Sequence, residues 1–453
     1  ILFKSNVKYY PWCTKQMKKL KSHFFFLSFI ISFTFSNDLN VKPIIFALHS
    51  SNGSDWVYEK TPITSFGAGL SFKFRNPTWS ILVDYMQLGF IGQINRSLYS
   101  FSPIKSLPYL DESKDADGYW SEYVKTKITY KLKTAKIHLG IFDRNIGQGV
   151  NSIHISRKSA SFPQIGFDWQ IKKSLNFIYF HGFLNSGIND SSRSIFYENE
   201  IGQRIIDVPR NIAFHRIEWK PIDDFVLGFN ESVIYSLRNL DFHYLVPVAP
   251  FYPIENYLGD TDNIQMGFDF LYNFKDKQKF YIGFFMDELT PEWIFNSKNH
   301  NWFAYQIGYG LDHLIFQNSS FILEYNWTDQ RIYKHKYKIN DFYSHGEPLG
   351  FWAGPHSEEL SAYYSFKINN LEIKIDYSEV KRGLISDETT ITNYNDTYNS
   401  RYTDGYEYRN YFSAKIRTAS KVKGLNYIFG VNQIKFDNNG LVDDFSSSNK
   451  ISI

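Results

Sequence analysis

Apolar and polar positions alternate along many short stretches of this chain. In SFGAGLSFKFR, residues 65–75, Leu70 falls on one face and Ser71 on the other. The stretches YVKTKITYKL (123–132) and LEIKIDY (371–377) repeat this pattern, each with charged residues in its middle. A period of two predicts β-strands with one apolar face. After residue 40, no apolar run approaches ~18 residues, which excludes transmembrane helices.

Short and long connections alternate between the predicted strands. The short turns fall at 75–78, 133–136, around Lys173, and at 221–224, 275–278, 369–370 and 419–423, with a somewhat longer link near 311–319. The long segments run near 91–121, 143–165, 185–211, 236–264, 288–301, 328–357 and 381–407. A soluble sandwich has no reason to sort its connections in this way, whereas bacterial outer-membrane barrels combine short periplasmic turns with long outer loops. The sequence therefore predicts an all-β protein, a transmembrane antiparallel β-barrel whose long outer loops partly plug the lumen.

The strand count predicts the size of this barrel. Roughly 17 strands lie between about residue 43 and about residue 436, and a bacterial single-chain barrel normally has an even number. The last predicted strand, 424–436, runs outward, and the tail after it is expected to form an outer loop without a returning strand. We therefore expect a barrel of about 18 strands whose sequence is truncated at the C-terminus. A 16-stranded barrel with loose ends is the alternative.

The N-terminal region carries an export signal. Lys18, Lys19 and Lys21 form a positive segment, Phe24–Phe35 is apolar, and Ser36 is a small residue suited to cleavage. We therefore interpret residues 1–16 as upstream sequence translated in frame, 17–36 as a signal peptide, and 37–453 as the barrel. A retained anchor helix is the alternative. The only cysteine, Cys13, precedes the predicted mature chain, which leaves no thiol for disulfides or metal binding.

Composition supports an exported barrel. Aromatic residues make up 19% of the chain, yet the mean hydropathy is −0.35. A disordered chain is less aromatic and a polytopic helical membrane protein less polar, whereas outer-membrane barrels combine both properties. The net charge of +3 is too small to indicate nucleic-acid binding. We expect the protein in the outer membrane of a Gram-negative-type bacterium, in contact with its lipid.

Charged side chains interrupt the apolar stretch from 211 to 252. The predicted lumen charge network comprises Arg216, Glu218, Glu231, Arg238 and Asp241. Such a network would hold the proline-rich loop that follows as a plug, and a purely structural role is the favoured interpretation. Simple alternation places Glu231 on the lipid face, where a charge costs up to a few kcal/mol. We therefore expect a β-bulge, or a position above the membrane, that returns Glu231 to polar surroundings.

These residues resemble those of a known family. The segments HRIEWKP, GFNESVIYSLRNLDFHYLVPVAPFYPIEN, GDTDNIQMGFDF and FFMDEL, within residues 215–289, and more weakly IFDRNIGQGVNSIHIS (141–156), resemble the Wzi-type capsule-assembly proteins of the outer membrane. The resemblance implies an 18-stranded barrel closed to free diffusion. It also implies a surface lectin that retains exported capsular polysaccharide, with the polysaccharide-export machinery as a partner.

Two predicted loops, 287–302 and 341–359, place aromatic rings beside carboxylates. Sugar binding uses such a combination, because flat apolar faces stack on pyranose rings and carboxylates accept hydroxyl hydrogens. The predicted polysaccharide-binding residues are Glu288, Glu292, Trp293, Trp302, His345, Trp352, His356 and Glu358. The competing interpretation assigns the rings to the membrane-interface belt and the charges to solvated loop.

No motif indicates catalysis. A glycosidase needs two acids at a defined separation, and no catalytic motif surrounds the loop carboxylates. The segment 111–122 lacks the final carboxylate of a calcium loop. The segment GDTDN (259–263) is more simply a turn capped by its own Asp side chains than a Ca²⁺ site. We expect a non-enzymatic polysaccharide-binding barrel without cofactor or metal, and the alternative is a porin-like channel for small solutes.

Overall fold

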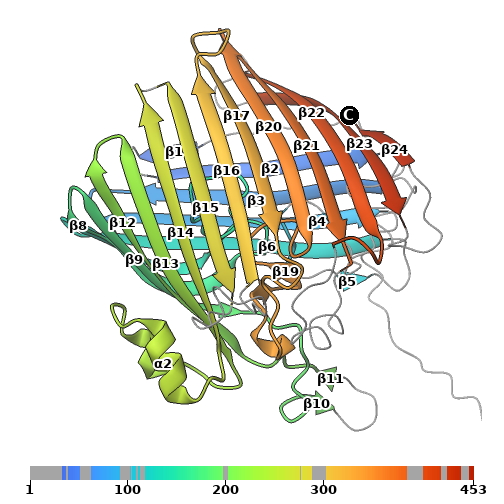
Figure 1. Ribbon diagram of the computed structural model, residues 1–453. Helices are drawn as coiled ribbons and strands as arrows, with labels where there is room; N and C mark the ends of the chain where they lie inside the picture. Colours follow the sequence, from blue (N-terminus) through green and yellow to red (C-terminus); the bar gives the residue numbers. More distant parts are fainter. Residues whose placement is uncertain are drawn as a thin grey trace, which may run out of the picture.

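The computed structural model describes residues 33–36, 39–50, 63–91, 101, 103, 105–108, 111–112, 118–196, 203–275, 277–287, 302–384, 401–419, 426–439 and 448–452. Within them, one antiparallel sheet of twenty strands curves round into a barrel (Figure 1). Three of its strands are short, namely β1 (Phe33–Ser36), β5 (Asp111–Glu112) and β24 (Ser448–Ser452). No helix among the described residues is long and apolar enough to cross a membrane.

The other seventeen strands of this sheet have eight residues or more. They are β2 (Leu39–Ser50), β3 (Ile63–Arg75), β4 (Trp79–Ile91), β6 (Gly118–Lys131), β7 (Ala135–Phe142), β8 (Phe162–Lys172), β9 (Leu175–Leu184), β12 (Arg210–Ile222), β13 (Phe225–Ser236), β14 (Asn263–Phe274), β15 (Gln278–Asp287), β16 (Trp302–Asp312), β17 (Ser319–Thr328), β20 (Ser357–Ile368), β21 (Leu371–Gly383), β22 (Tyr406–Ala419) and β23 (Asn426–Asn439). Two small hairpins, β10–β11 (Ile195–Phe196, Gln203–Arg204) and β18–β19 (Tyr343–Ser344, Glu347–Pro348), lie in the long connections.

The alternation of short and long connections is confirmed. Each long strand pairs with the next, and short turns such as 173–174 and 369–370 alternate with long connections such as 143–161 and 329–356. The long connections gather at one end of the barrel (Figure 1). The predicted fold class, an antiparallel barrel of about 18 strands with loops in its lumen, is therefore confirmed.

The two ends of the sheet differ from the expectation. The tail was expected to lack a returning strand, but β24 pairs with β23 in antiparallel register, Lys450 opposite Ile434. Its sequence, SNKIS, is too short and polar for an alternating pattern, because backbone hydrogen bonds rather than apolar side chains define this strand. Residues 33–36, inside the predicted signal peptide, form β1, which pairs with β2.

The two faces of the sheet follow the alternation. Leu70 points outward and is 54% exposed, whereas its neighbour Ser71 points into the lumen and donates a hydrogen bond to Asp84 at 2.5 Å. The outward positions are mainly apolar and the lumen positions mainly polar, as in outer-membrane barrels.

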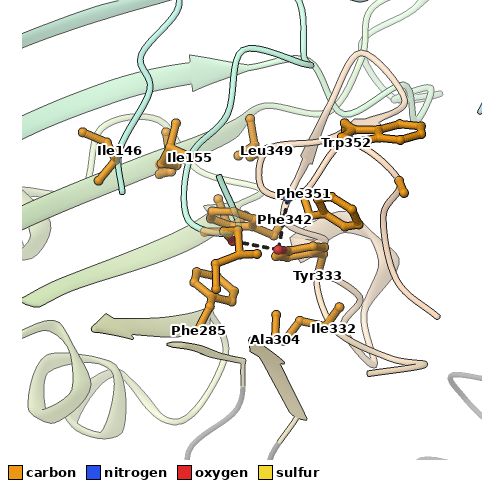
Figure 2. Packing of buried hydrophobic residues seen from close by; sticks show 14 of the residues in the cluster. Ile146, Ile155, Phe285, Ala304, Ile332, Tyr333, Phe342, Leu349, Phe351 and Trp352 are labelled. Carbon is orange, nitrogen blue, oxygen red and sulfur yellow. Dashed lines mark hydrogen bonds between the residues drawn. The ribbon is translucent and has the colours of Figure 1, made fainter. Parts of the chain in front are cut away.

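Loops fill the lumen near the long-loop end. On β12 the residues from Arg210 to Arg216 are buried, whereas those from Ile217 to Ile222 are mostly exposed. The covering segments are the residues of 101–108 that the structure describes, together with 143–161 and 329–356, which we call the plug. Their apolar side chains join lumen-facing strand residues in one buried cluster (Figure 2).

A second layer covers the outside of the barrel. Residues 237–262, which we call the flap, form the 3-10 helix η3 (Phe242–Leu245) and the helix α2 (Phe251–Leu258), and α2 lies outside the barrel wall (Figure 1). Tyr244 and Phe251 of the flap pack with outward-facing residues of β9, β12, β13 and β14 in a separate apolar cluster. Tyr179 Oη of β9 donates a hydrogen bond to the carbonyl oxygen of Tyr244 at 2.9 Å.

The flap also explains Glu231. No β-bulge lies at this residue, because β12 and β13 keep regular register with His215 opposite Glu231. The predicted bulge is therefore wrong. The Glu231 side chain points outward, is only 3% exposed, and accepts hydrogen bonds from the backbone N–H groups of Phe251 and Tyr252 at 2.8 and 2.7 Å. The flap supplies the polar surroundings that this carboxylate requires.

Candidate functional site

The centre of the plug is built around Tyr333. Its hydroxyl donates to the carbonyl oxygen of Ile153 at 2.7 Å and accepts from the N–H of Phe351 at 3.1 Å, so it joins two plug segments (Figure 2). Its ring stacks on Phe342 and also packs against Phe285 of β15. Burial raises the pKa of the Tyr333 hydroxyl far above its ordinary value, so the hydroxyl keeps the proton that it donates to Ile153.

A buried carboxylate on β17 holds the first plug segment to the barrel wall. Glu324 accepts hydrogen bonds from the N–H groups of Val150 and Asn151 at 2.7 and 2.9 Å. The Tyr281 hydroxyl donates to it at 2.6 Å and the Asn326 amide at 2.9 Å. Four donors satisfy a carboxylate that is fully buried, so this contact fixes the loop without an unpaired polar group.

A neighbouring carboxylate on β20 joins both long plug segments. Glu359 accepts from the Asn151 amide at 2.8 Å and from the Trp352 indole N–H at 3.1 Å. The Trp352 ring stacks on Phe101 at 5.2 Å between centroids. Trp352 is therefore a core residue of the plug, and this burial contradicts its predicted place among the polysaccharide-binding residues. The same correction applies to Trp302, which is fully buried beneath Arg331.

Arg216 is the centre of the lumen charge network. Its guanidinium donates to Asp269 of β14 at 2.8 Å and to Glu218 at 2.9 Å. Asp269 also accepts from Gln148 of the plug at 2.9 Å. A Cβ atom at Gly228 would lie 2.0 Å from the Arg216 guanidinium, so a larger residue here would displace this side chain from where it crosses β13.

The other predicted members of this network lie elsewhere. Glu231 faces outward, on the opposite side of the sheet from Arg216, because adjacent strand positions alternate in direction. Arg238 pairs with Asp241 at 2.8 Å and with Asp262 at 2.6 Å inside the flap. The structure therefore brings Arg216 and Glu218 together, whereas Glu231, Arg238 and Asp241, which were predicted in the same lumen network, lie outside it. The spacing along the chain did not indicate that residues after Ser236 turn to the outside.

A cluster of aromatic and charged side chains lies at the long-loop end of β20, β21 and β22. This rim cluster comprises His356, Glu358, Lys381, Arg401, Tyr402 and Tyr406. The Tyr402 ring stacks on His356 at 4.9 Å between centroids, and its hydroxyl donates to Glu358 at 3.1 Å. The ammonium of Lys381 lies 4.0 Å from the ring centroids of both Tyr402 and Tyr406. Half-exposed rings beside a cation and a carboxylate could contact the faces and hydroxyl groups of a sugar.

The buried ring of His356 supports the Tyr402 ring of this cluster. It is only 6% exposed, and burial lowers its pKa to about 4, so the ring is neutral at physiological pH. The ring pairs with the Leu384 carbonyl oxygen at 2.9 Å through Nδ1, and Nε2 accepts from the N–H of Tyr402 at 3.3 Å. Burial raises the pKa of the Tyr402 hydroxyl to about 12. The Arg401 guanidinium donates to the Thr328 carbonyl oxygen at 2.6 Å and completes the support.

The structure brings together only part of the predicted polysaccharide site. His356 and Glu358 meet in the rim cluster, whereas His345 lies apart, half-buried with Nδ1 3.0 Å from the Pro108 carbonyl oxygen. Glu288, Glu292 and Trp293 lie outside the described residues. The sequence analysis missed Arg401 and Tyr402, and the only local signal was an aromatic ring beside a cation in the long segment 381–407. Among the described residues, no group of His, Cys, Asp or Glu has the arrangement of a metal site.

Comparisons with known proteins were made at the level of sequence and of structure. The sequence matches no protein-family model and no curated protein. The fold is similar to that of Wzi, an outer membrane protein involved in group 1 capsule assembly in Escherichia coli and a carbohydrate-binding β-barrel. The two chains are 13% identical over 92% of this chain and 84% of that chain, with a TM-score of 0.53.

Two further solved structures are similar over much of their length. OccAB2 of Acinetobacter baumannii is 11% identical over 92% of this chain and 95% of its own, with a TM-score of 0.48. OccK5 (OpdH) of Pseudomonas aeruginosa is 10% identical over 92% and 94%, with a TM-score of 0.45. At 13% identity the likeness to Wzi establishes the fold alone, and this chain has the fold of an outer-membrane β-barrel.

Proposed function

We propose that this protein is a non-enzymatic, Wzi-type barrel of the Gram-negative outer membrane that binds surface or capsular polysaccharide and assists its assembly or retention. In this proposal residues 17–36 direct export, and the polysaccharide-export machinery delivers the glycan. The observation that carries it is the plug. A lumen filled by loops that Glu324, Glu359 and Asp269 hold to the wall is suited to presenting a fixed surface rather than to passing solutes.

The rim cluster supports the glycan-binding part of the proposal. It lies at the long-loop end, which faces the cell exterior in outer-membrane barrels. His356 and Arg401 hold the rings of the cluster in place. A glycan would therefore bind side chains that are already ordered, without the entropy cost of ordering them. The half-exposed rings of the cluster would pack against a sugar, and Lys381 and Glu358 would contact hydroxyl or carboxylate groups.

The first experiment measures single-channel conductance of the reconstituted full chain. The same preparation is then tested for retention of polysaccharide extracted from the cell surface. The proposal expects a silent barrel that retains polysaccharide. A large, steady conductance would instead identify the porin-like channel, and silence without retention would leave a structural barrel.

A pair of matched variants tests the rim cluster directly. Tyr402→Ala removes the stacking ring, whereas Tyr402→Phe keeps the ring and removes only the hydroxyl that donates to Glu358. We expect Tyr402→Ala to weaken polysaccharide retention by tenfold or more and Tyr402→Phe to weaken it much less. Equal retention by both variants and the unmodified chain would place glycan binding elsewhere.

A further inference from the structure

The flap, which connects β13 to β14, exposes several large apolar side chains. Its large exposed side chains are Leu237, Leu240, Phe242, Val246, Val248 and Tyr257. Phe242 is 80% exposed and Tyr257 82%, values that leave almost the whole side chain without protein contacts. Six large apolar side chains exposed within one segment of 26 residues indicate an interaction site rather than ordinary solvated loop.

Most charged side chains of the flap are paired. Arg238 is paired with Asp241 and Asp262, and Asp260 points toward Lys336 of the 329–356 segment at 3.5 Å. Glu255 is buried. The other exposed residues with polar side chains are Asn239, Asn256 and Thr261, together with His243, which contacts Asp241, and Asp260, which contacts Lys336. Apolar side chains as exposed as Phe242 at 80% and Val248 at 73% favour a hydrocarbon partner.

The flap continues the lipid-facing belt of the barrel. On β13 the outward residue Phe229 is 45% exposed, and the next outward residue, Glu231, lies under α2. Two strand residues span about 7 Å, so the edge of the flap begins about that far along β13 from side chains that face the membrane. On β14 the neighbouring outward residue Phe268 is likewise exposed, at 44%.

A groove joins the flap to the same belt. It has a volume of about 540 Å³ and lies against the outer face of β7 to β9, with Leu245 of η3 as its flap-side wall. Its other walls include Ile137, Ile165, Trp169 and Tyr179. A groove this apolar, on a surface that faces hydrocarbon, has the shape and chemistry for one lipid acyl chain.

We propose that the flap is an interfacial lipid clamp. It inserts Phe242, Val246 and Val248 among the acyl chains of the outer leaflet, and it holds one chain in the groove between Leu245 and the strands β7 to β9. The clamp sets how deep the barrel lies in the membrane on this side, close to the end that the plug fills. This role goes beyond polysaccharide binding and does not depend on it.

The test uses fluorescent labels in the full chain. In a Cys13→Ser background, the variants Phe242→Cys and Val248→Cys carry an environment-sensitive fluorophore and are reconstituted in phosphatidylcholine vesicles with dibrominated acyl chains. Ile307→Cys, an outward position on β16, is the membrane-facing control. Ser191→Cys, an exposed position in the 185–209 connection, is the water-facing control.

We expect bromine to quench the labels at 242 and 248 as strongly as at 307, with aqueous iodide quenching only the label at 191. Iodide quenching without bromine quenching at 242 and 248 would overturn the proposal. Protection of these labels by added polysaccharide would overturn it as well, and would identify the flap as a glycan surface. For the groove, native mass spectrometry should find one retained lipid, which Ile165→Trp reduces severalfold. Equal retention by Ile165→Trp would contradict the assignment of the groove.

Discussion

The carboxylate of Glu231 accepts a hydrogen bond from the backbone N–H of Phe251, the first residue of helix α2, at 2.8 Å. The second helical N–H, that of Tyr252, donates to the same carboxylate at 2.7 Å. The N-cap residue, Pro250, has no side-chain acceptor, so a strand residue twenty positions earlier caps this helix. His215 also contacts Glu231 at 3.0 Å, and its ring stacks on Phe251. One acidic side chain on the outside of the barrel therefore anchors the first turn of α2 to the wall.

Replacing Glu231 should release the flap and leave the barrel intact. Glu231→Ala removes the acceptor of two helix N–H groups and leaves them buried without partners, at a cost of about 2–3 kcal/mol for charged hydrogen bonds of this kind. Hydrogen exchange at residues 251–258 should become ten- to a hundredfold faster, while exchange on β16 should stay unchanged. Glu231→Gln retains one acceptor oxygen and should have a smaller effect. Loss of protection on β16 would show instead that Glu231 supports the barrel itself.

The docking of α2 should also depend on pH through Glu255. Burial, together with the neighbouring Asp260, raises the pKa of the Glu255 carboxyl to about 8, from an ordinary value of 4.5. Because the folded value lies above the unfolded one, this group's stabilising contribution is complete below about pH 4.5 and is lost as the pH rises through about 8. Asp262 and Tyr244 also face Glu255, whereas Glu231 and His215 contact the first turn of the helix.

A label on the flap can follow this dependence. The Val248→Cys fluorophore should report looser docking as the pH is raised from 5 to 9, and Glu255→Gln should flatten the profile because its side chain cannot ionise. The label on Ile307→Cys corrects for any response of the fluorophore to pH. An unchanged slope in Glu255→Gln would assign the dependence to another group.

The plug should open when its anchor on β17 is removed. Glu324→Ala deletes the acceptor for the N–H groups of Val150 and Asn151, which then lack partners inside the lumen. We expect the 143–161 segment to detach and the single-channel conductance to rise from near zero to discrete open events. Ser361→Ala, a neighbouring lumen position on β20, is the matched control and should remain silent. A silent Glu324→Ala barrel would show that the 329–356 segment closes the lumen alone.

The sequence predicted the barrel because the evidence for it is local. Alternation within each strand and the length of each connection are properties of neighbouring residues, and both were confirmed across the long strands. The candidate site depends on contacts between distant segments. Trp302 and Trp352 have the appearance of loop aromatics, yet packing against Arg331 and Phe101 buries them. Alternation gave the direction of Glu231 correctly, but only the folded flap shows what covers it.

Mid-strand carboxylates were an overlooked signal of the plug. Glu324 lies on the polar face of an alternating stretch, with Asn326 and Thr328. An acid at such a position faces the lumen and needs more donors than its own strand supplies. Two of the four donors come from 150 and 151, more than 170 residues away in the chain. The need for a partner could therefore be predicted from the sequence, whereas its identity could not.

Arg216 and Asp269 should stabilise the barrel as a pair. Replacing Arg216 alone should therefore lower the free energy of unfolding more than replacing both residues. Arg216→Met leaves Asp269 with only Gln148 and the neighbouring His154 as partners, and breaking a buried ion pair in this way costs about 3–5 kcal/mol. Adding Asp269→Leu removes the stranded charge and should recover part of that loss. Urea unfolding of the refolded barrel in lipid vesicles, followed by tryptophan fluorescence, gives the free energy of unfolding for the unmodified chain and for Arg216→Met, Asp269→Leu and the double variant. Strictly additive losses would mean that the two side chains do not depend on each other, because a cycle on coupled neighbours gives a nonzero interaction energy.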